Sequence, residues 1–219
     1  IRSIPFSLLV DKDGKHWFES QQVTLAPSLA FLADRTGRRD AASGGLAILN
    51  GGTARQLPPQ AEQDLKAIYP NAVHSASADF KGYKHLAAKQ GALLIATHGI
   101  IGAAPWDNYL EIAPTADHDA RLRPFEISQM ELKAKLVVLV ACDALNSEDT
   151  SNYRDLGLAT SFLNAGAGAV LAPRWKVPAG DGVGDTTSSF IVDFFRMYRK
   201  SGDAPAALQQ ARKASATRG

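Results

Sequence analysis

Four short apolar runs constrain the fold of this chain more than any other feature of its sequence. None of them alternates apolar with polar residues in the manner of a half-buried strand. They are residues 45–50 (GLAILN), 92–97 (ALLIAT), 136–142 (LVVLVAC) and 168–173 (GAVLAP). Continuous apolar runs of this length are typical of strands buried on both faces, as in a parallel sheet covered by helices. Residues 71–75 (NAVHS) form a weaker fifth candidate strand.

Helical patterns separate these runs. Pro59 suits the first turn of a helix, Asp79 is a candidate N-cap, and Gly166 is a natural end for the helix before it. The alternation of strands and helices predicts a doubly wound α/β sheet with right-handed crossovers. The first 40 residues are expected to form an irregular or hairpin-like lead-in. The expected helices are residues 59–68, 79–90, 127–133, 152–165, 186–200 and 204–217.

Length and composition narrow the class of protein. A chain of 219 residues with 45% hydrophobic and 21% charged residues suits an ordinary globular α/β domain rather than a disordered protein. The single cysteine excludes an intramolecular disulfide framework and any multi-cysteine zinc site. A net charge of +2 gives no electrostatic case for a nucleic-acid partner. No apolar stretch approaches the roughly 20 residues of a membrane span, so a membrane partner is not expected either.

The N-terminus of the chain and the absence of a visible domain boundary lead to three expectations. The chain begins with Ile1 rather than Met, which indicates a fragment of a longer protein. It carries no secretory signal pattern, which favours a cytoplasmic location. No domain boundary is visible in the sequence, so residues 1–219 are expected to form a single domain.

Three long loops follow the carboxyl ends of predicted strands. They are residues 99–126, 143–151 and 174–185. Ligands of open α/β sheets sit at that edge, and loops of this length in a compact domain are usually functional. The edge of the sheet is therefore the expected location of a functional site.

Two chemically reactive side chains end neighbouring predicted strands. His98 follows the strand 92–97, and Cys142 closes the strand 136–142. If these strands are parallel and adjacent, both side chains emerge at the same edge. A thiol beside an imidazole is a nucleophile and base pair, and proton transfer by such a base contributes roughly 10²–10⁴ in rate. The backbone N–H groups of Gly99 and Cys142 are candidate donors for an oxyanion hole.

A second interpretation of these residues stays open on chemistry alone. A lone cysteine that ends an apolar strand is commonly an inert part of the core. A lone histidine in a loop is commonly structural or solvated. The position of both residues at consecutive strand ends is what favours the catalytic interpretation over the structural one.

The motifs at these strand ends resemble those of the CHAT family, which is in the same clan as caspases and separase. The resemblance rests on ATHG around His98, on LVVLVAC up to Cys142, and on the run GLATSFLNAGAGAVLAPRWKV. It covers essentially the whole chain. Cys142 lies 44 residues after His98, near the separation of about 50 in caspases. The resemblance implies a caspase-like α/β/α sandwich with a mostly parallel central sheet.

The same resemblance implies a cysteine endopeptidase. Cys142 would match the family nucleophile, His98 the family histidine, and Gly99 with the backbone of Cys142 the oxyanion hole. The implied chemistry needs no metal and no organic cofactor. The implied partners are a protein or peptide substrate and an upstream tetratricopeptide-repeat or sensor region that controls activity.

This sequence departs from the family pattern close to the cysteine. The family usually has Ser before Ala-Cys and Thr-Gly shortly after it, whereas this chain has Val140 and Ala144-Leu145. The departures leave the Cys–His pair in place and change the residues around it. A catalytically silent caspase-like module that recruits or gates partners is the alternative that they favour.

Substrate preference depends on residues in the two later loops. Asp143, Asp181 and Asp185 are candidates to hold a basic side chain of the substrate, since a buried carboxylate pairs with arginine through two hydrogen bonds. Asp143 can instead cap a turn and Asp185 a helix. Trp175 is a candidate subsite wall or a core residue. Its neighbours Arg174 and Lys176 would instead favour an acidic substrate residue.

Two weaker signals give structural expectations only. Asn50-Gly51-Gly52 follows a strand, but no phosphate-binding motif accompanies it, so a plain turn is expected. The remaining histidines show no metal-ligand spacing and are expected to be solvated. They are His16, His74, His85 and His118.

Overall fold

The structure is a computed structural model that describes residues 9–28, 31, 45–51, 57–141, 157–173 and 186–218. The chain divides into two compact units. The sheet unit comprises Asp34–Pro58 and Tyr69–Ala179. The helical unit comprises Ile1–Ala33, Pro59–Ile68 and Gly180–Gly219. Each unit is described by itself.

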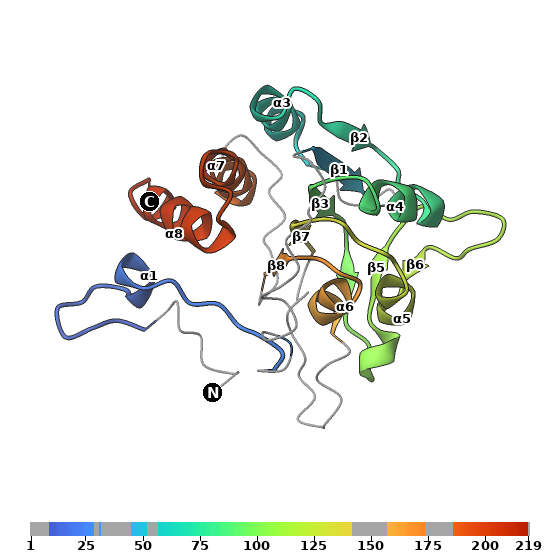
Figure 1. The fold of residues 1–219 in the computed structure, drawn as a ribbon, viewed down its shortest axis with the longest axis horizontal. Coiled ribbons are helices and arrows are strands. Elements are labelled where there is room, and N and C mark those ends of the chain that lie inside the picture. The colour runs from blue at the N-terminus through green and yellow to red at the C-terminus, as the bar shows by residue number, and fades with distance from the viewer. Residues whose placement is uncertain are drawn as a thin grey trace. The chain divides into compact units, whose positions relative to one another are not determined.

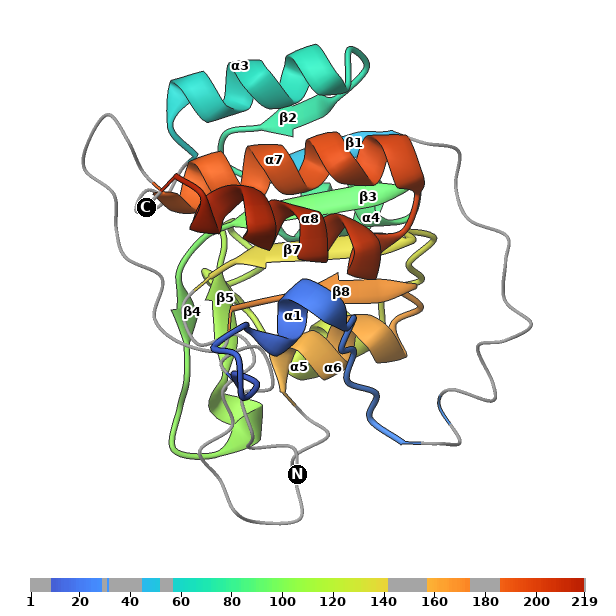
Figure 2. The same cartoon turned by 90° about the vertical axis from the view of Figure 1, so that its left-hand side faces the viewer.

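A parallel five-stranded sheet forms the centre of the sheet unit. Its strand order is β2-β1-β3-β7-β8, and every neighbouring pair is parallel. Figure 2 shows the strands one below another in this order. All five expected strands are confirmed, within a few residues at their ends. Their bounds are β1 Leu46–Asn50, β2 Val73–Ser75, β3 Ala92–Ala96, β7 Leu136–Val140 and β8 Ala169–Leu171.

The three central strands are buried along their whole length. Every residue of β1, β3 and β7 is buried, so both faces of these strands are covered, as their unbroken apolar sequences predict. The expectation is wrong for β8, whose three residues are only half-buried. β8 lies at the end of the strand order beside β7. Its apolar sequence therefore belongs to an edge strand.

Three helices pack on one face of this sheet. They are α4 (Phe80–Ala87), α5 (Pro124–Ser128) and α6 (Leu158–Asn164), and Figure 1 shows all three on the same side. Their buried side chains join the odd-numbered residues of the central strands in one core cluster. From the helices the cluster includes Tyr83, Ile127 and Phe162, and from the strands Leu49, Ile95 and Leu139. Alternate residues of a strand point to the same face, which explains the odd-numbered set.

Local capping determines where these helices begin. The Asp79 side chain accepts a hydrogen bond from the Gly82 N–H at 2.7 Å, which confirms Asp79 as the N-cap of α4. Helix α6 begins at Leu158 rather than at residue 152, with Gly157 as its N-cap. The expected helix 127–133 is wrong. Helix α5 begins earlier, at Pro124, because proline suits the first turn and Glu126 accepts from the Arg123 N–H at 2.8 Å.

The segment 99–126 is not an irregular loop, which corrects the prediction for it. It forms a second sheet of order β4-β5-β6, with β4 Gly99–Ile100, β5 Tyr109–Glu111 and β6 Arg121–Leu122. A short 3₁₀ helix, η2 (Pro105–Asp107), connects β4 to β5. Leu110, Ile112 and Leu122 from this small sheet are fully buried in the core cluster. Figure 2 shows β4 and β5 crossing the end of the large sheet at which β7 finishes.

The helical unit contains α1 (Trp17–Ser20), α3 (Pro59–Ile68), α7 (Thr186–Ser201) and α8 (Ala204–Ala216). The three long helices confirm the prediction within one residue at each end. Gly202 has a φ of 66° between α7 and α8, and the Asp203 side chain caps α8. Asp193 on α7 forms ion pairs with Arg196 and Arg218, each at 2.5 Å. The lead-in, as far as it is described, is irregular apart from α1, with an antiparallel bridge between Val10 and His16.

Candidate active site

The carboxyl edge of the large sheet has the topology of a ligand-binding site. β1 and β3 are neighbours, but the chain leaves β1 for β2 on one side and leaves β3 for β7 on the other. Such a reversal of strand order opens a crevice beyond the carboxyl ends of the two strands. Strand β1 ends at Asn50 and is followed by Gly51, and strand β3 is followed by Thr97 and His98.

The backbone on either side of His98 is held by three strands. The Thr97 N–H donates to the Val140 carbonyl oxygen at 3.2 Å, which ties the end of β3 to the end of β7. The His98 carbonyl oxygen accepts from the Glu111 N–H at 2.9 Å, which ties His98 to β5. Within the described residues, no hydrogen bond reaches the half-buried His98 ring. The main chain at His98 is thus fixed while its imidazole has no partner in the described part of the protein.

Gly99 begins β4, and its pairing determines where its N–H points. Gly99 pairs with Leu110 and Ile100 with Tyr109 in an antiparallel ladder. Because the Glu111 N–H donates to the His98 carbonyl oxygen, the next pair, Gly99 and Leu110, is a non-hydrogen-bonded pair. The Gly99 N–H is therefore directed away from β5. This orientation leaves it available as a donor, as an oxyanion-hole role requires.

Gly51 and Thr97 make a close contact behind the edge. The Thr97 hydroxyl, which is fully buried, donates to the Glu111 carbonyl oxygen at 2.5 Å. A Cβ on Gly51 would lie 2.1 Å from that oxygen and 2.3 Å from Thr97 Oγ1. Only glycine leaves room for β5 to pass here. The sequence interpretation of Gly51 as a turn residue missed this contact, although a glycine directly after a buried strand is a signal for close backbone approach.

Asn50 is the most unusual polar residue at this edge. It is 1% exposed, and its side-chain nitrogen lies 3.0 Å from Nε2 of His74 on β2. Its side-chain oxygen Oδ1 is buried and has no hydrogen-bond partner. Buried polar atoms in native proteins are nearly always paired, so an exception of this kind needs an explanation. Sequence reasoning missed Asn50, and the signal was an asparagine at the end of an otherwise apolar strand.

The other predicted site residues lie outside the described part of the chain. They are Cys142, Asp143, Trp175, Asp181 and Asp185. The last described residue before the cysteine is Ala141, which is fully buried in the core cluster. Of the predicted site, the structure therefore brings together His98 and Gly99 and leaves the positions of the other residues as predictions.

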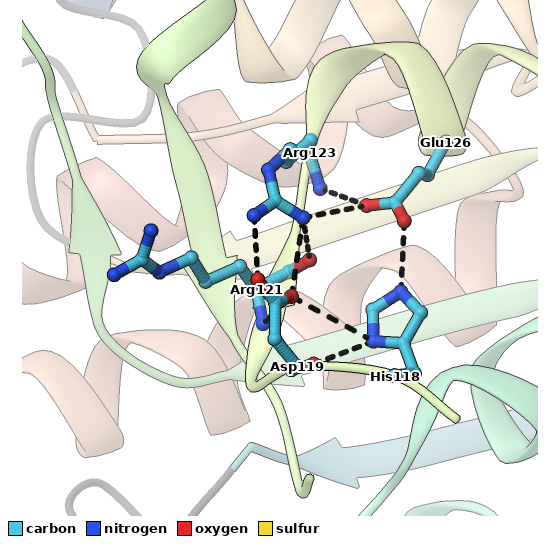
Figure 3. A network of polar contacts seen from close by, with 5 residues as sticks. All are labelled: His118, Asp119, Arg121, Arg123 and Glu126. Carbon is cyan, nitrogen blue, oxygen red and sulfur yellow. Dashed lines mark hydrogen bonds and ion pairs between the residues drawn. The ribbon is translucent and has the colours of Figure 1, made fainter. Parts of the chain in front are cut away.

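A second polar cluster surrounds His118, which lies in the connection between β5 and β6 (Figure 3). His118 Nε2 lies 2.8 Å from a Glu126 carboxylate oxygen, and Nδ1 lies 2.5 Å from the Asp119 carbonyl oxygen. Both ring nitrogens of His118 therefore have a hydrogen-bonding partner in the surrounding residues. The ring also stacks on Phe80 of α4, with centroids 4.6 Å apart and planes 7° apart. The expectation that His118 is solvated is therefore wrong.

Two further charges complete this cluster. Arg123 binds the Asp119 carboxylate through both terminal nitrogens, at 2.6 and 3.1 Å. The hydrogen bond from Arg123 holds the pKa of Asp119 below its usual range, and the same bond raises the pKa of Arg123. Arg121 points away from the other four residues (Figure 3), and its guanidinium lies 5.1 Å from the centre of the Tyr109 ring. The side chains of His118, Asp119, Arg123 and Glu126 all have charged or polar partners within the cluster, which indicates a structural role.

No group of three or more His, Cys, Asp or Glu side chains is placed to hold a metal ion in the described ranges. None of the described helices is long and apolar enough to cross a membrane.

Comparison with known protein families identifies the chain as a whole. The family model for the CHAT domain matches residues 1–218. The chain belongs to the CHAT domain family. This family is caspase-like and related to cysteine peptidases, and the parallel five-stranded sheet with helices packed on it agrees with that fold class. No curated protein matches the chain.

Proposed function

We propose that this CHAT domain is a cysteine endopeptidase in which Cys142 is the nucleophile and His98 transfers protons. One observation carries the proposal, namely the register of β3 and β7. Ala96 pairs with Val140 across these adjacent parallel strands. His98 and Cys142 each follow two residues after that pair. Neighbouring parallel strands end at the same edge of a sheet, and this register supports the proposed pairing of His98 with Cys142.

The proposed reaction proceeds through a thioester. The Cys142 thiol gives its proton to His98, and the sulfur attacks the carbonyl carbon of the scissile peptide bond. The N–H groups of Gly99 and Cys142 stabilise the oxyanion that forms. The C–N bond breaks as the leaving amine takes a proton from the imidazolium of His98. Water then gives a proton to His98 and attacks the thioester. This step releases a carboxylic acid and restores the thiol.

The loops after the cysteine are proposed to select the substrate. Asp143, Asp181 and Asp185 would hold a basic side chain, with Trp175 as an apolar wall of the subsite. Arg174 and Lys176 would instead favour an acidic side chain. The family resemblance supports a protein or peptide substrate, with an upstream tetratricopeptide-repeat or sensor region as the partner that controls cleavage.

The single cysteine allows a direct test. A peptide that ends in a chloromethyl ketone can alkylate only one thiol in this chain. Two sets of probes, one ending in Arg or Lys and one in Asp, test both substrate preferences. We expect adduct formation on Cys142 and cleavage of matching peptides, both abolished in Cys142→Ala. Cleavage that persists in folded Cys142→Ala would overturn the proposal. His85→Ala, which changes an exposed histidine of α4, is the matched control for His98→Ala.

A silent regulatory module is the second candidate function. The observation that favours it is Val140, a buried residue of β7 where the family usually has serine. This candidate predicts tight binding of a partner protein with no cleavage by the wild-type domain. Rapid, stoichiometric alkylation of Cys142 by a peptide probe, far faster than alkylation of the unfolded chain, would argue against it.

A further inference from the structure

We propose that Asn50 is a positioning residue for His98, and that its side-chain oxygen, unpaired in this structure, accepts a hydrogen bond from the imidazole in the catalytically active state. The inference deepens the proposed function and rests on it, because it assigns a partner to the proposed catalytic histidine. Its starting point is the unpaired oxygen of a side chain that is 1% exposed. That oxygen lies at the reversal of strand order where a ligand site is expected.

The register of the sheet places Asn50 next to His98. Asn50 pairs with Ala96 on the adjacent parallel strand, and His98 follows two residues later. Adjacent strands are about 4.8 Å apart and each residue advances the chain by about 3.3 Å, so the Cα atoms of Asn50 and His98 are about 8 Å apart. Two polar side chains of this length span such a distance when they point toward each other.

Strand alternation predicts that the two side chains share a face. Thr97 and Gly51 meet on the face that carries the small sheet, because a Cβ on Gly51 would touch Thr97 Oγ1. Asn50 and His98 each neighbour one of these residues in the sequence, and successive residues of an extended chain point to opposite faces. Asn50 and His98 therefore belong to the other face.

The pairing of the Asn50 amide determines which of its atoms is available. The amide nitrogen lies 3.0 Å from Nε2 of His74, and an amide N–H donates to an unprotonated ring nitrogen. The remaining atom, Oδ1, accepts hydrogen bonds only. A neutral His98 has one N–H and one unprotonated nitrogen. If Oδ1 binds the N–H, the other nitrogen is left to face the thiol. An acceptor at this position thus fixes the tautomer that a base needs.

The most direct test observes the tautomer of His98 by ¹⁵N NMR of the histidine rings, assigned with His98→Gln. In the wild-type domain at a pH where the ring is neutral, we expect one tautomer to dominate. In Asn50→Leu, which removes the acceptor at similar volume, we expect a mixture of the two tautomers. A mixture of the two His98 tautomers in the folded wild type would overturn the proposal. This observation does not require any variant to fold.

Kinetics provides a second readout. Misplacement of a catalytic group by about 1 Å costs on the order of 10²-fold in rate, so Asn50→Leu is expected to lower kcat by about 10- to 100-fold with KM little changed. Asn50→Asp, which retains an acceptor, is expected to restore most of kcat. A change in KM alone would overturn the proposal, because it would assign Asn50 to substrate binding.

The matched control is Asn108, another buried asparagine of the sheet unit. Its Oδ1 already accepts from the Gly102 N–H at 2.9 Å. Asn108→Leu is expected to lower stability and leave the His98 tautomer unchanged. An equal tautomer change in both variants would overturn the proposal. The NMR readout does not require proteolysis, so a fixed tautomer without cleavage would reject the proposed function while leaving the Asn50–His98 contact established.

Discussion

His98 and His118 lie in the same unit of the protein but in opposite chemical situations. Both nitrogens of His118 have acceptors and its ring stacks on Phe80. The His98 ring has no hydrogen bond within the described residues, and nearby Asn50 keeps an unpaired oxygen. Polar groups that hold a fold together are normally satisfied by it. Polar groups that perform chemistry keep bonding capacity free, so the sheet edge is the better candidate for function.

The largest expected difference between the two regions is in catalysis. His98→Ala is expected to lower kcat by roughly 10²–10⁴, because general acid–base transfer is lost. His118→Ala is expected to leave kcat within a few-fold of wild type at temperatures where the variant is folded. Steady-state cleavage of the peptide selected by the alkylation probes measures both. Equal losses in the two folded variants would remove the distinction drawn here.

Gly51→Ala tests how closely β5 passes the edge. The new Cβ would lie 2.1 Å from the Glu111 carbonyl oxygen, and overpacking of this kind costs about 1–3 kcal/mol. We expect a lower free energy of unfolding in urea together with a lower kcat, since Glu111 also binds the His98 carbonyl oxygen. Gly157→Ala, at a position with no atom within 4 Å of the new Cβ and without a positive φ, is the control that lacks the contact. An unchanged stability for Gly51→Ala would contradict the close approach.

Glu126→Gln tests the structural cluster directly. The carboxylate accepts from His118 and from the Arg123 N–H, and a hydrogen bond to a charged group contributes about 1.5–3 kcal/mol. Glutamine keeps one acceptor oxygen, so we expect a loss of about 1–2 kcal/mol in urea unfolding with kcat unchanged. A fall in kcat without a loss of stability would assign the cluster to catalysis instead.

Tyr83 also has an unpaired polar atom, but it belongs to the core cluster. Its hydroxyl is buried without a hydrogen-bond partner in the described structure, and burial raises its pKa. It lies on α4 and belongs to the core cluster. Removing an unpaired buried hydroxyl is close to neutral or stabilising, so Tyr83→Phe is expected to raise stability by up to about 1 kcal/mol. If Tyr83→Phe instead loses catalytic activity, the unpaired hydroxyl of a core-cluster residue has a function.

The smallest expected effect is on acid stability. Arg123 lowers the pKa of Asp119 in the folded state, so the pair stabilises the fold above the unfolded pKa of about 3.9. This contribution is lost as the pH falls through the lowered pKa. Asp119 is half-exposed, which makes the contribution small. Asp119→Asn should therefore flatten the dependence of unfolding free energy on pH below about 4, and an unchanged slope would show that the pair contributes nothing.

Much of the large sheet could be predicted from sequence because its strands are continuous apolar runs. The small sheet could not, because β4 and β6 have two residues each and β5 has three. Segments this short show no hydrophobic periodicity. They become strands because they pair with one another in the folded protein. The sequence prediction placed helix α5 too late in the chain. Pro124 and the hydrogen bond from the Arg123 N–H to Glu126 start the helix before the apolar residues on which the prediction rested.

The candidate site also contains residues that could be predicted from the sequence and residues that could not. His98 and Gly99 could be found because a reactive residue type directly follows a recognisable strand. Asn50, Gly51 and Thr97 could not, because their roles depend on the register between β1 and β3 and on the path of β5. Neither feature is encoded within a single segment of the chain.

The central claim is that His98 and Cys142 act together on a peptide carbonyl. The most direct measurement is the rate at which a peptide chloromethyl ketone alkylates Cys142, followed by intact mass, in wild type, His98→Ala and His85→Ala. The account predicts one adduct per chain, formed at the same rate in wild type and His85→Ala and about 10²-fold or more slowly in folded His98→Ala. Equal rates in all three proteins would contradict it.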